Sequence, residues 1–204
     1  AALAMAVVGA ACGDSGAGGA GDDGMATGSG SNCTPGDLTC KCLPDMTCNN
    51  PKLACMGNIC HSPLAEGALR ARLHVAGLAG DVEVDSAGTG GWHAGEPPDA
   101  RAVATAAAHG IDIAGLRARK LLVEDFERFD WILCADRDNL AQAQARKPIT
   151  SHGRPVLLLE WAGRRVRREV PDPYEGGPRD FARAWALVDD AAARIVERIR
   201  DGRA

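Results

Sequence analysis

The chain has 204 residues, of which 46% are hydrophobic and 25% are charged, and its formal net charge is −4. This length predicts one domain of ordinary size with additional chain, and the apolar fraction is enough for a core. No stretch reaches the ~18 consecutive apolar residues of a membrane span. The slightly acidic balance argues against nucleic acid as a partner.

The chain begins with small apolar residues up to Ala11, followed by Cys12. Such a stretch before a cysteine resembles the end of a bacterial lipoprotein signal, which predicts a lipid anchor at Cys12 and a membrane-anchored or periplasmic location. Gly9 stands where such signals usually carry a larger aliphatic residue. A disordered Ala/Gly terminus is therefore the alternative.

The next segment changes composition twice. Residues 13–32 are small and polar, so they cannot offset their ordering entropy and are expected to form a flexible linker that closes a first region, 1–32. Residues 33–60 hold six cysteines with interspersed Pro and Asn turn signals. This pattern favours a disulfide-stapled module over a metal site, because paired CxxC motifs are absent. We assign 33–54 to this Cys-rich segment and 55–204 to a third region.

From residue 62 onward, short apolar strands alternate with helices. Ser62-Pro63 is typical of a helix start, with Ser62 as the N-cap. Alternation of this kind predicts an α/β fold with a parallel four-stranded sheet and helices on both faces. The ligand site is then expected at the carboxyl ends of the strands. The expected strands are 82–84, 131–134 and 156–159, and the expected helices are 63–73, 98–109, 139–146 and 181–199.

The segment Cys55-Met56-Gly57-Asn58-Ile59-Cys60-His61-Ser62-Pro63 combines a leading cysteine, a short loop and a helix start. Backbone N–H groups in such a loop form a nest for an anion, and the helix N-terminus adds partial positive charge. The same field lowers the pKa of a cysteine and favours its nucleophilic thiolate. The pattern therefore predicts a phosphate-binding loop with a nucleophile.

Further motifs follow in order: Asp85-Ser86-Ala87-Gly88-Thr89, Trp92-His93-Ala94-Gly95-Glu96-Pro97, Asp99-Ala100-Arg101, Gly110-Ile111-Asp112-Ile113, Asp136-Arg137 with Asn139-Leu140, and Asp172-Pro173-Tyr174. With these motifs, residues 55–204 resemble the low-molecular-weight protein tyrosine phosphatases, whose fold is shared by thioredoxin-coupled arsenate reductases. The arsenate reductase activity needs extra resolving cysteines. Cys134, which ends an apolar strand, is more typical of a buried residue.

The resemblance implies hydrolysis of phosphotyrosine proteins or small aryl phosphates through a phosphocysteine, without metal or cofactor, in the cytoplasm. It implies that Cys55 is the nucleophile and Asp172 the general acid. It further implies that Trp92 and Tyr174 grip the phenyl ring, and that the loop residues bind the phosphate or shape the loop. These loop residues are Gly57, Asn58, Ile59, Cys60 and Ser62.

Two departures from the family pattern bear on activity. The family loop ends in Arg, where this chain has His61. A guanidinium is permanently charged and bidentate, whereas an imidazole offers one donor, so we expect impaired catalysis. The family also has an apolar strand directly before the cysteine, but residues 49–54 contain Pro51 and no β-branched run, which makes the first strand doubtful.

Cys55 belongs to both the Cys-rich pattern and the phosphatase loop. If Cys55 is half of a disulfide, it cannot be a nucleophile. The alternative function is then a surface-anchored, non-catalytic protein that binds an anion or a partner. The cluster of Arg164, Arg165, Arg167 and Arg168 is interpreted as a solvated face beside the loop that carries Asp172, which we call the acid loop. Alternatively, this cluster is a patch that draws anionic substrates to the site.

Overall fold

The structure is a computed structural model that describes residues 3–9, 59–91, 93–166 and 168–202. In this part of the chain a four-stranded sheet has the order β2-β1-β3-β4, and every neighbouring pair is parallel. The α/β class and the parallel sheet predicted from the sequence are confirmed. The strands are β1 (Leu3–Gly9), β2 (Val82–Gly88), β3 (Trp131–Cys134) and β4 (Arg154–Leu157).

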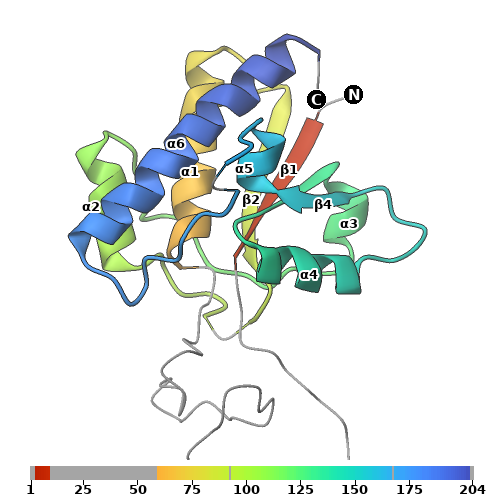
Figure 1. The fold of residues 1–204 in the computed structure, drawn as a ribbon, viewed down its shortest axis with the longest axis horizontal. Helices are drawn as coiled ribbons and strands as arrows, with labels where there is room; N and C mark the ends of the chain where they lie inside the picture. Colours follow the sequence, from red (N-terminus) through yellow and green to blue (C-terminus); the bar gives the residue numbers. More distant parts are fainter. Residues whose placement is uncertain (1–2, 10–58, 92, 167, 203–204) are drawn as a thin grey trace, which may run out of the picture. The chain divides into compact units, whose positions relative to one another are not determined.

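Helices cover both faces of the sheet. Figure 1 shows α1, α2 and α6 together on one side of the strands and α3 and α4 on the other. Among the described residues, no helix is both long and apolar enough to cross a membrane. The helices are α1 (His61–Val75), α2 (Ala100–Ala108), α3 (Asp125–Arg128), α4 (Arg137–Arg146), α5 (Leu158–Trp161) and α6 (Pro178–Arg200).

The strand β1 lies between β2 and β3, although no strand was predicted for residues 3–9. Side chains alternate across a strand, so Met5 and Val7 join the core beneath α1 and α6, whereas Ala6 and Val8 join the core beside α3 and α4. The apolar run that resembles a signal end is thus buried on both faces, as a central parallel strand requires.

This placement differs from the division of the chain proposed from the sequence. That division set residues 1–32 apart from the phosphatase-like region, but Leu3–Gly9 belong to the same compact unit as residues 59–202. The first strand, which the sequence left doubtful, is formed by this N-terminal segment. The linker, the Cys-rich segment and Cys12 lie outside the described residues.

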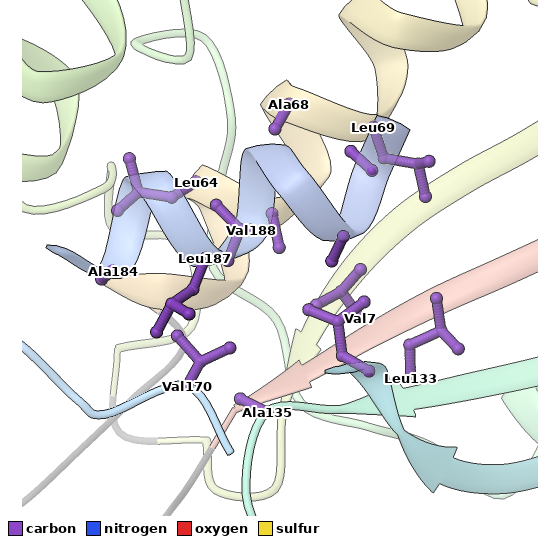
Figure 2. Packing of buried hydrophobic residues seen from close by; sticks show 14 of the residues in the cluster. Val7, Leu64, Ala68, Leu69, Leu133, Ala135, Val170, Ala184, Leu187 and Val188 are labelled. Carbon is purple, nitrogen blue, oxygen red and sulfur yellow. The ribbon is translucent and has the colours of Figure 1, made fainter. Parts of the chain in front are cut away.

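The main core lies between the sheet and the two long helices. Figure 2 shows Val7 and Leu133 of neighbouring strands facing side chains of α1 and α6, among them Leu64 and Val188. In α6 an apolar stripe recurs every three or four residues, which turns one face of a long helix toward the sheet. Its buried members include Phe181, Ala184, Trp185, Val188, Ala192, Ile195 and Val196, as predicted.

Several element boundaries differ from prediction, and two of these differences bear on the site and on the core. The helix α1 begins two residues earlier than expected, at His61 rather than Pro63, with Cys60 rather than Ser62 at the N-cap and without a side-chain capping bond. The expected strand 156–159 is split, because β4 ends at Leu157 and α5 follows at once. Buried Leu158 and Leu159 serve equally well in a short helix, since an apolar run of this length does not distinguish helix from strand.

Candidate functional site

The candidate site lies where β1 ends and α1 begins, at the carboxyl edge of the sheet. Gly9 closes β1, and its carbonyl accepts a hydrogen bond from the Thr89 N–H at 2.8 Å. A Cβ at residue 9 would lie 2.5 Å from Ser62 Oγ and 2.8 Å from His61 Cε1. Glycine therefore permits the first turn of α1 to approach the strand end this closely.

His61 and Asp172 face each other at this edge. The Nε2 atom of His61 lies 3.6 Å from Oδ2 of Asp172, and the two side chains are 3% and 11% exposed. His61 Nδ1 lies 3.5 Å from Ser62 Oγ, while Nε2 has no hydrogen-bond partner among the described residues. The site thus holds a buried imidazole nitrogen that is available to a ligand, beside the N-terminus of a 15-residue helix.

The loop that carries Asp172 is anchored on both sides. Val170 is buried, and its N–H donates to the Ala135 carbonyl directly after β3, at 2.8 Å. Asp172 Oδ1 accepts a hydrogen bond from the Tyr174 N–H at 2.8 Å, which is an Asx turn between two prolines. These bonds hold one carboxylate oxygen in the turn and leave Oδ2 directed at His61.

Cys60 is buried at the N-cap of α1, and its thiol is free. Burial raises the pKa of the Cys60 thiol far above its ordinary value, and the negative charges of Asp172 and Asp99 raise it further, against a smaller lowering by Arg101. The thiol is therefore protonated at neutral pH. It is ill suited to nucleophilic attack, which requires the thiolate.

Asp99 and Arg101 have a positioning role that sequence reasoning missed, although both stand in a quoted motif. The Asp99 N–H donates to the Ile59 carbonyl at 2.8 Å, and the Asp99 carboxylate caps α2 and binds Arg101 in a bidentate pair. Arg101 also donates to the Gly176 carbonyl at 3.1 Å. This pair therefore links the segment before α1 to the end of the acid loop. The signal available in the sequence was an N-cap carboxylate two residues before an arginine.

The buried carboxylate of Glu66 connects α1, whose N-terminus forms the site, to the neighbouring strand β2. Glu66 in α1 is 2% exposed, accepts a hydrogen bond from Ser86 Oγ and pairs with Arg70 at 2.6 Å. Burial raises the pKa of Glu66 above its ordinary value, although the Ser86 bond and Arg70 oppose the shift. Arg70 also donates to the Val84 carbonyl at 2.7 Å. These contacts fix the helix α1 against β2.

Six of the predicted site residues are described, and they fall into one region. Ile59, Cys60, His61 and Ser62 are buried at the start of α1, and Asp172 and Tyr174 come from the acid loop. The Tyr174 ring lies 5.7 Å from the Arg101 guanidinium carbon. Cys55, Gly57, Asn58 and Trp92 lie outside the described residues.

The described arrangement suits an anion with a transferable proton nearby. A helix N-terminus and an imidazole N–H can donate to phosphate oxygens, and a neighbouring carboxyl group can give or take a proton. Cys134 is fully buried at the end of β3, as expected of a packed residue rather than a redox partner. No group of three or more His, Cys, Asp or Glu side chains among the described residues could hold a metal ion.

Comparisons with known proteins agree with this geometry. A family model described as "Low molecular weight phosphotyrosine protein phosphatase" matches residues 52–204. The low-molecular-weight phosphotyrosine protein phosphatase of Schizosaccharomyces pombe is 38% identical over 146 residues, which is 71% of this chain and 93% of that protein. The low-molecular-weight protein-tyrosine-phosphatase of Streptomyces coelicolor is 38% identical over 150 residues, or 72% of this chain and 91% of that protein.

Solved structures give the same result for the fold. The crystal structure of a protein tyrosine phosphatase from Entamoeba histolytica, with Hepes in its active site, superimposes with a TM-score of 0.68. The two sequences are 28% identical, and the match covers 73% of this chain and 95% of that one.

Proposed function

Because this chain belongs to the low-molecular-weight phosphotyrosine protein phosphatase family, we propose that it hydrolyses the phosphomonoester of phosphotyrosine in proteins, through Cys55 and Asp172. The Cys55 thiolate attacks phosphorus, a P–S bond forms, and the P–O bond to the tyrosine breaks. Asp172 gives its proton to the departing phenolate oxygen. Asp172 then accepts a proton from water as the water oxygen attacks phosphorus, which releases inorganic phosphate and the thiolate.

The observation that carries this proposal is the approach of Asp172 to the first turn of α1. A carboxyl oxygen 3.6 Å from His61 Nε2, at a helix N-terminus, is within reach of the bridging oxygen of a phosphate bound there. The turn between Pro171 and Pro173 binds the other carboxylate oxygen, Oδ1, and leaves Oδ2 directed at His61. Tyr174, half-buried beside it, offers an aromatic surface for the phenyl ring of the substrate.

His61 makes the proposed activity weak. The buried Nε2 offers a single donor to phosphate, whereas an arginine would offer two parallel N–H groups and a permanent charge. Loss of one preorganised donor to a transition state costs on the order of 100- to 1000-fold in rate. We therefore expect slow turnover by the wild type and a large gain in kcat/KM when His61 is replaced by arginine.

A specific observation also favours a second function, non-catalytic binding of an anion or a partner. The strand β1 ends at Gly9, and residues 10–58 stand between this strand end and Ile59. In the family pattern the strand leads directly into the nucleophilic cysteine. The residue at the strand end that packs against Ser62 is Gly9, which carries no nucleophilic side chain. A disulfide of Cys55, as the Cys-rich sequence pattern suggests, would leave this site to bind an anion or a partner without catalysis.

The test is hydrolysis of a small aryl phosphate by the reduced chain and by three variants. His61→Arg should raise kcat/KM by about 100-fold or more, and Asp172→Asn should lower the activity by about 100-fold. His74→Arg is the matched control, because His74 is exposed at the other end of α1 and should leave turnover unchanged.

Thiol counting decides between the two functions. Alkylation of Cys55 in the native reduced chain, together with a gain for His61→Arg, supports the phosphatase. A Cys55 that mass spectrometry finds in a disulfide in the isolated chain, with no turnover in any reduced variant, supports the binding protein and contradicts the enzyme.

A further inference from the structure

A cationic groove lies beside the acid loop and has no role in the mechanism described above. Its volume is about 600 Å³, and it is lined by Arg137, Arg165, Arg168 and Arg183, with Glu169 and Pro171 between them. Four guanidinium groups against one carboxylate leave this groove with an excess of three positive charges. We call it the arginine groove.

The arginine groove adjoins the catalytic edge of the sheet. Pro171 precedes Asp172 directly, and Arg137 opens α4 just after β3 ends at Cys134. Val170, Leu187 of α6 and Ala135 belong to the same hydrophobic core (Figure 2), and the Val170 N–H donates to the Ala135 carbonyl just after β3. The groove is therefore built on rigid elements next to the acid residue.

Two of the four arginines have no ionic partner within the described part of the chain. Arg137 pairs with Glu169 at 2.5 Å, and Arg168 lies 3.6 Å from Glu160. Arg165 and Arg183 are exposed and form no ion pair with any described residue. An excess of unneutralised cations in a concave surface attracts anions and raises their local concentration.

We propose that the arginine groove binds an acidic segment that flanks the phosphotyrosine of the substrate, and so makes the enzyme selective for phosphotyrosine in Asp- and Glu-rich sequence. The proposal rests on the phosphatase function proposed above. Carboxylates of the flanking segment pair with Arg165 and Arg183, and the guanidinium fork suits bidentate binding of carboxylate. An extended peptide covers about 3.3 Å per residue, so a few residues reach from the acid loop into the groove.

A binding experiment tests the groove without relying on catalysis. The probe is a fluorescein-labelled peptide of about ten Asp and Glu residues, without phosphotyrosine, and its binding to the full chain is followed by fluorescence anisotropy. The double variant R165Q/R183Q should weaken binding about 5- to 10-fold, since each exposed ion pair contributes a factor of about 1.4 to 5. Binding should also fall steeply between about 0.1 M and 1 M salt.

The matched control is R117Q/R154Q, which removes the same charge from exposed arginines outside the groove. Within the described part of the chain, Arg117 donates only to carbonyl oxygens of its own loop, and Arg154 lies over the Trp131 ring. This control should bind the peptide as the wild type does. Equal losses in both double variants would show a response to net charge alone and would overturn the proposal.

Two further arms separate the outcomes. A single-stranded oligonucleotide of equal charge that binds as tightly as the peptide and responds to R165Q/R183Q would make the groove a general polyanion site and overturn the peptide proposal. In the second arm, the ratio of kcat/KM for an acidic-flanked over a neutral-flanked phosphotyrosine peptide should fall about 5- to 10-fold in R165Q/R183Q. Peptide binding without aryl phosphate hydrolysis would refute the phosphatase function alone, and hydrolysis without peptide binding would refute the groove alone.

Discussion

The central position of β1 makes a strong prediction about Val7. This side chain is 1% exposed and lies between Ser86 of β2 and Leu133 of β3 in the strand register. Val7→Ala removes two methyl groups, each contributing about 0.8 kcal/mol by transfer from water. The cavity left in a core that relaxes only partly adds about 1 kcal/mol. We therefore expect a loss of about 2–3 kcal/mol in the free energy of unfolding.

The assay is urea denaturation followed by circular dichroism, with Val75→Ala as the matched control. Val75 ends α1 and is 86% exposed, so the same two methyl groups contribute little there, and its variant should stay within about 0.5 kcal/mol of the wild type. In thermal scans, Val7→Ala should lower Tm by about 4–12 °C, at 2–4 °C per kcal/mol for a chain of this size. Equal midpoints for the two variants would refute the place of β1 in the core and favour the signal-like interpretation of residues 1–12.

Three further predictions concern the same strand and the site. Removal of residues 1–11, as cleavage before Cys12 would cause, should abolish cooperative unfolding, because β2 and β3 lose their shared neighbour; a truncated chain with the wild-type urea midpoint would contradict this. Arg101 lowers the pKa of Asp99, so the charged pair stabilises the fold above the ordinary pKa of Asp and this contribution is lost as pH falls through the lowered value. Asp99→Asn should therefore cost about 1 kcal/mol at pH 7, and the difference from wild type in urea midpoint should shrink toward pH 3. Burial raises the thiol pKa of both Cys60 and Cys134, so iodoacetamide should label them at pH 8 only after denaturation, and rapid native labelling of either would show that its burial is wrong.

The order of the motifs predicted the family correctly, because the loop-helix junction, the segment Asp85-Ser86-Ala87-Gly88 and the Asp-Pro pair each need particular residue types. The alternation of short apolar strands with helices predicted the α/β class correctly. The helical periodicity of apolar residues also predicted which faces of α1 and α6 are buried. The strand β1 was missed because Ala-rich apolar residues with a terminal glycine suit a signal end as well as a buried strand. The contact between Asp99 and Ile59 was also missed, because a backbone hydrogen bond between distant segments does not depend on the pattern of side chains in the sequence.

The sequence alone determined which chemical groups are present, because these follow from residue identity. It showed that His61 stands where the family pattern has Arg, and that two prolines flank Asp172. Only the tertiary structure decided that Leu3–Gly9 form the central strand, because a strand is defined by partners, and both of its partners lie more than seventy residues further along the chain. The same holds for the approach of Asp172 to His61 and for the arginine groove, where residues from α4, α6 and the acid loop meet. Burial on two faces and convergence at the end of a sheet are properties of packing, which one segment cannot specify by itself.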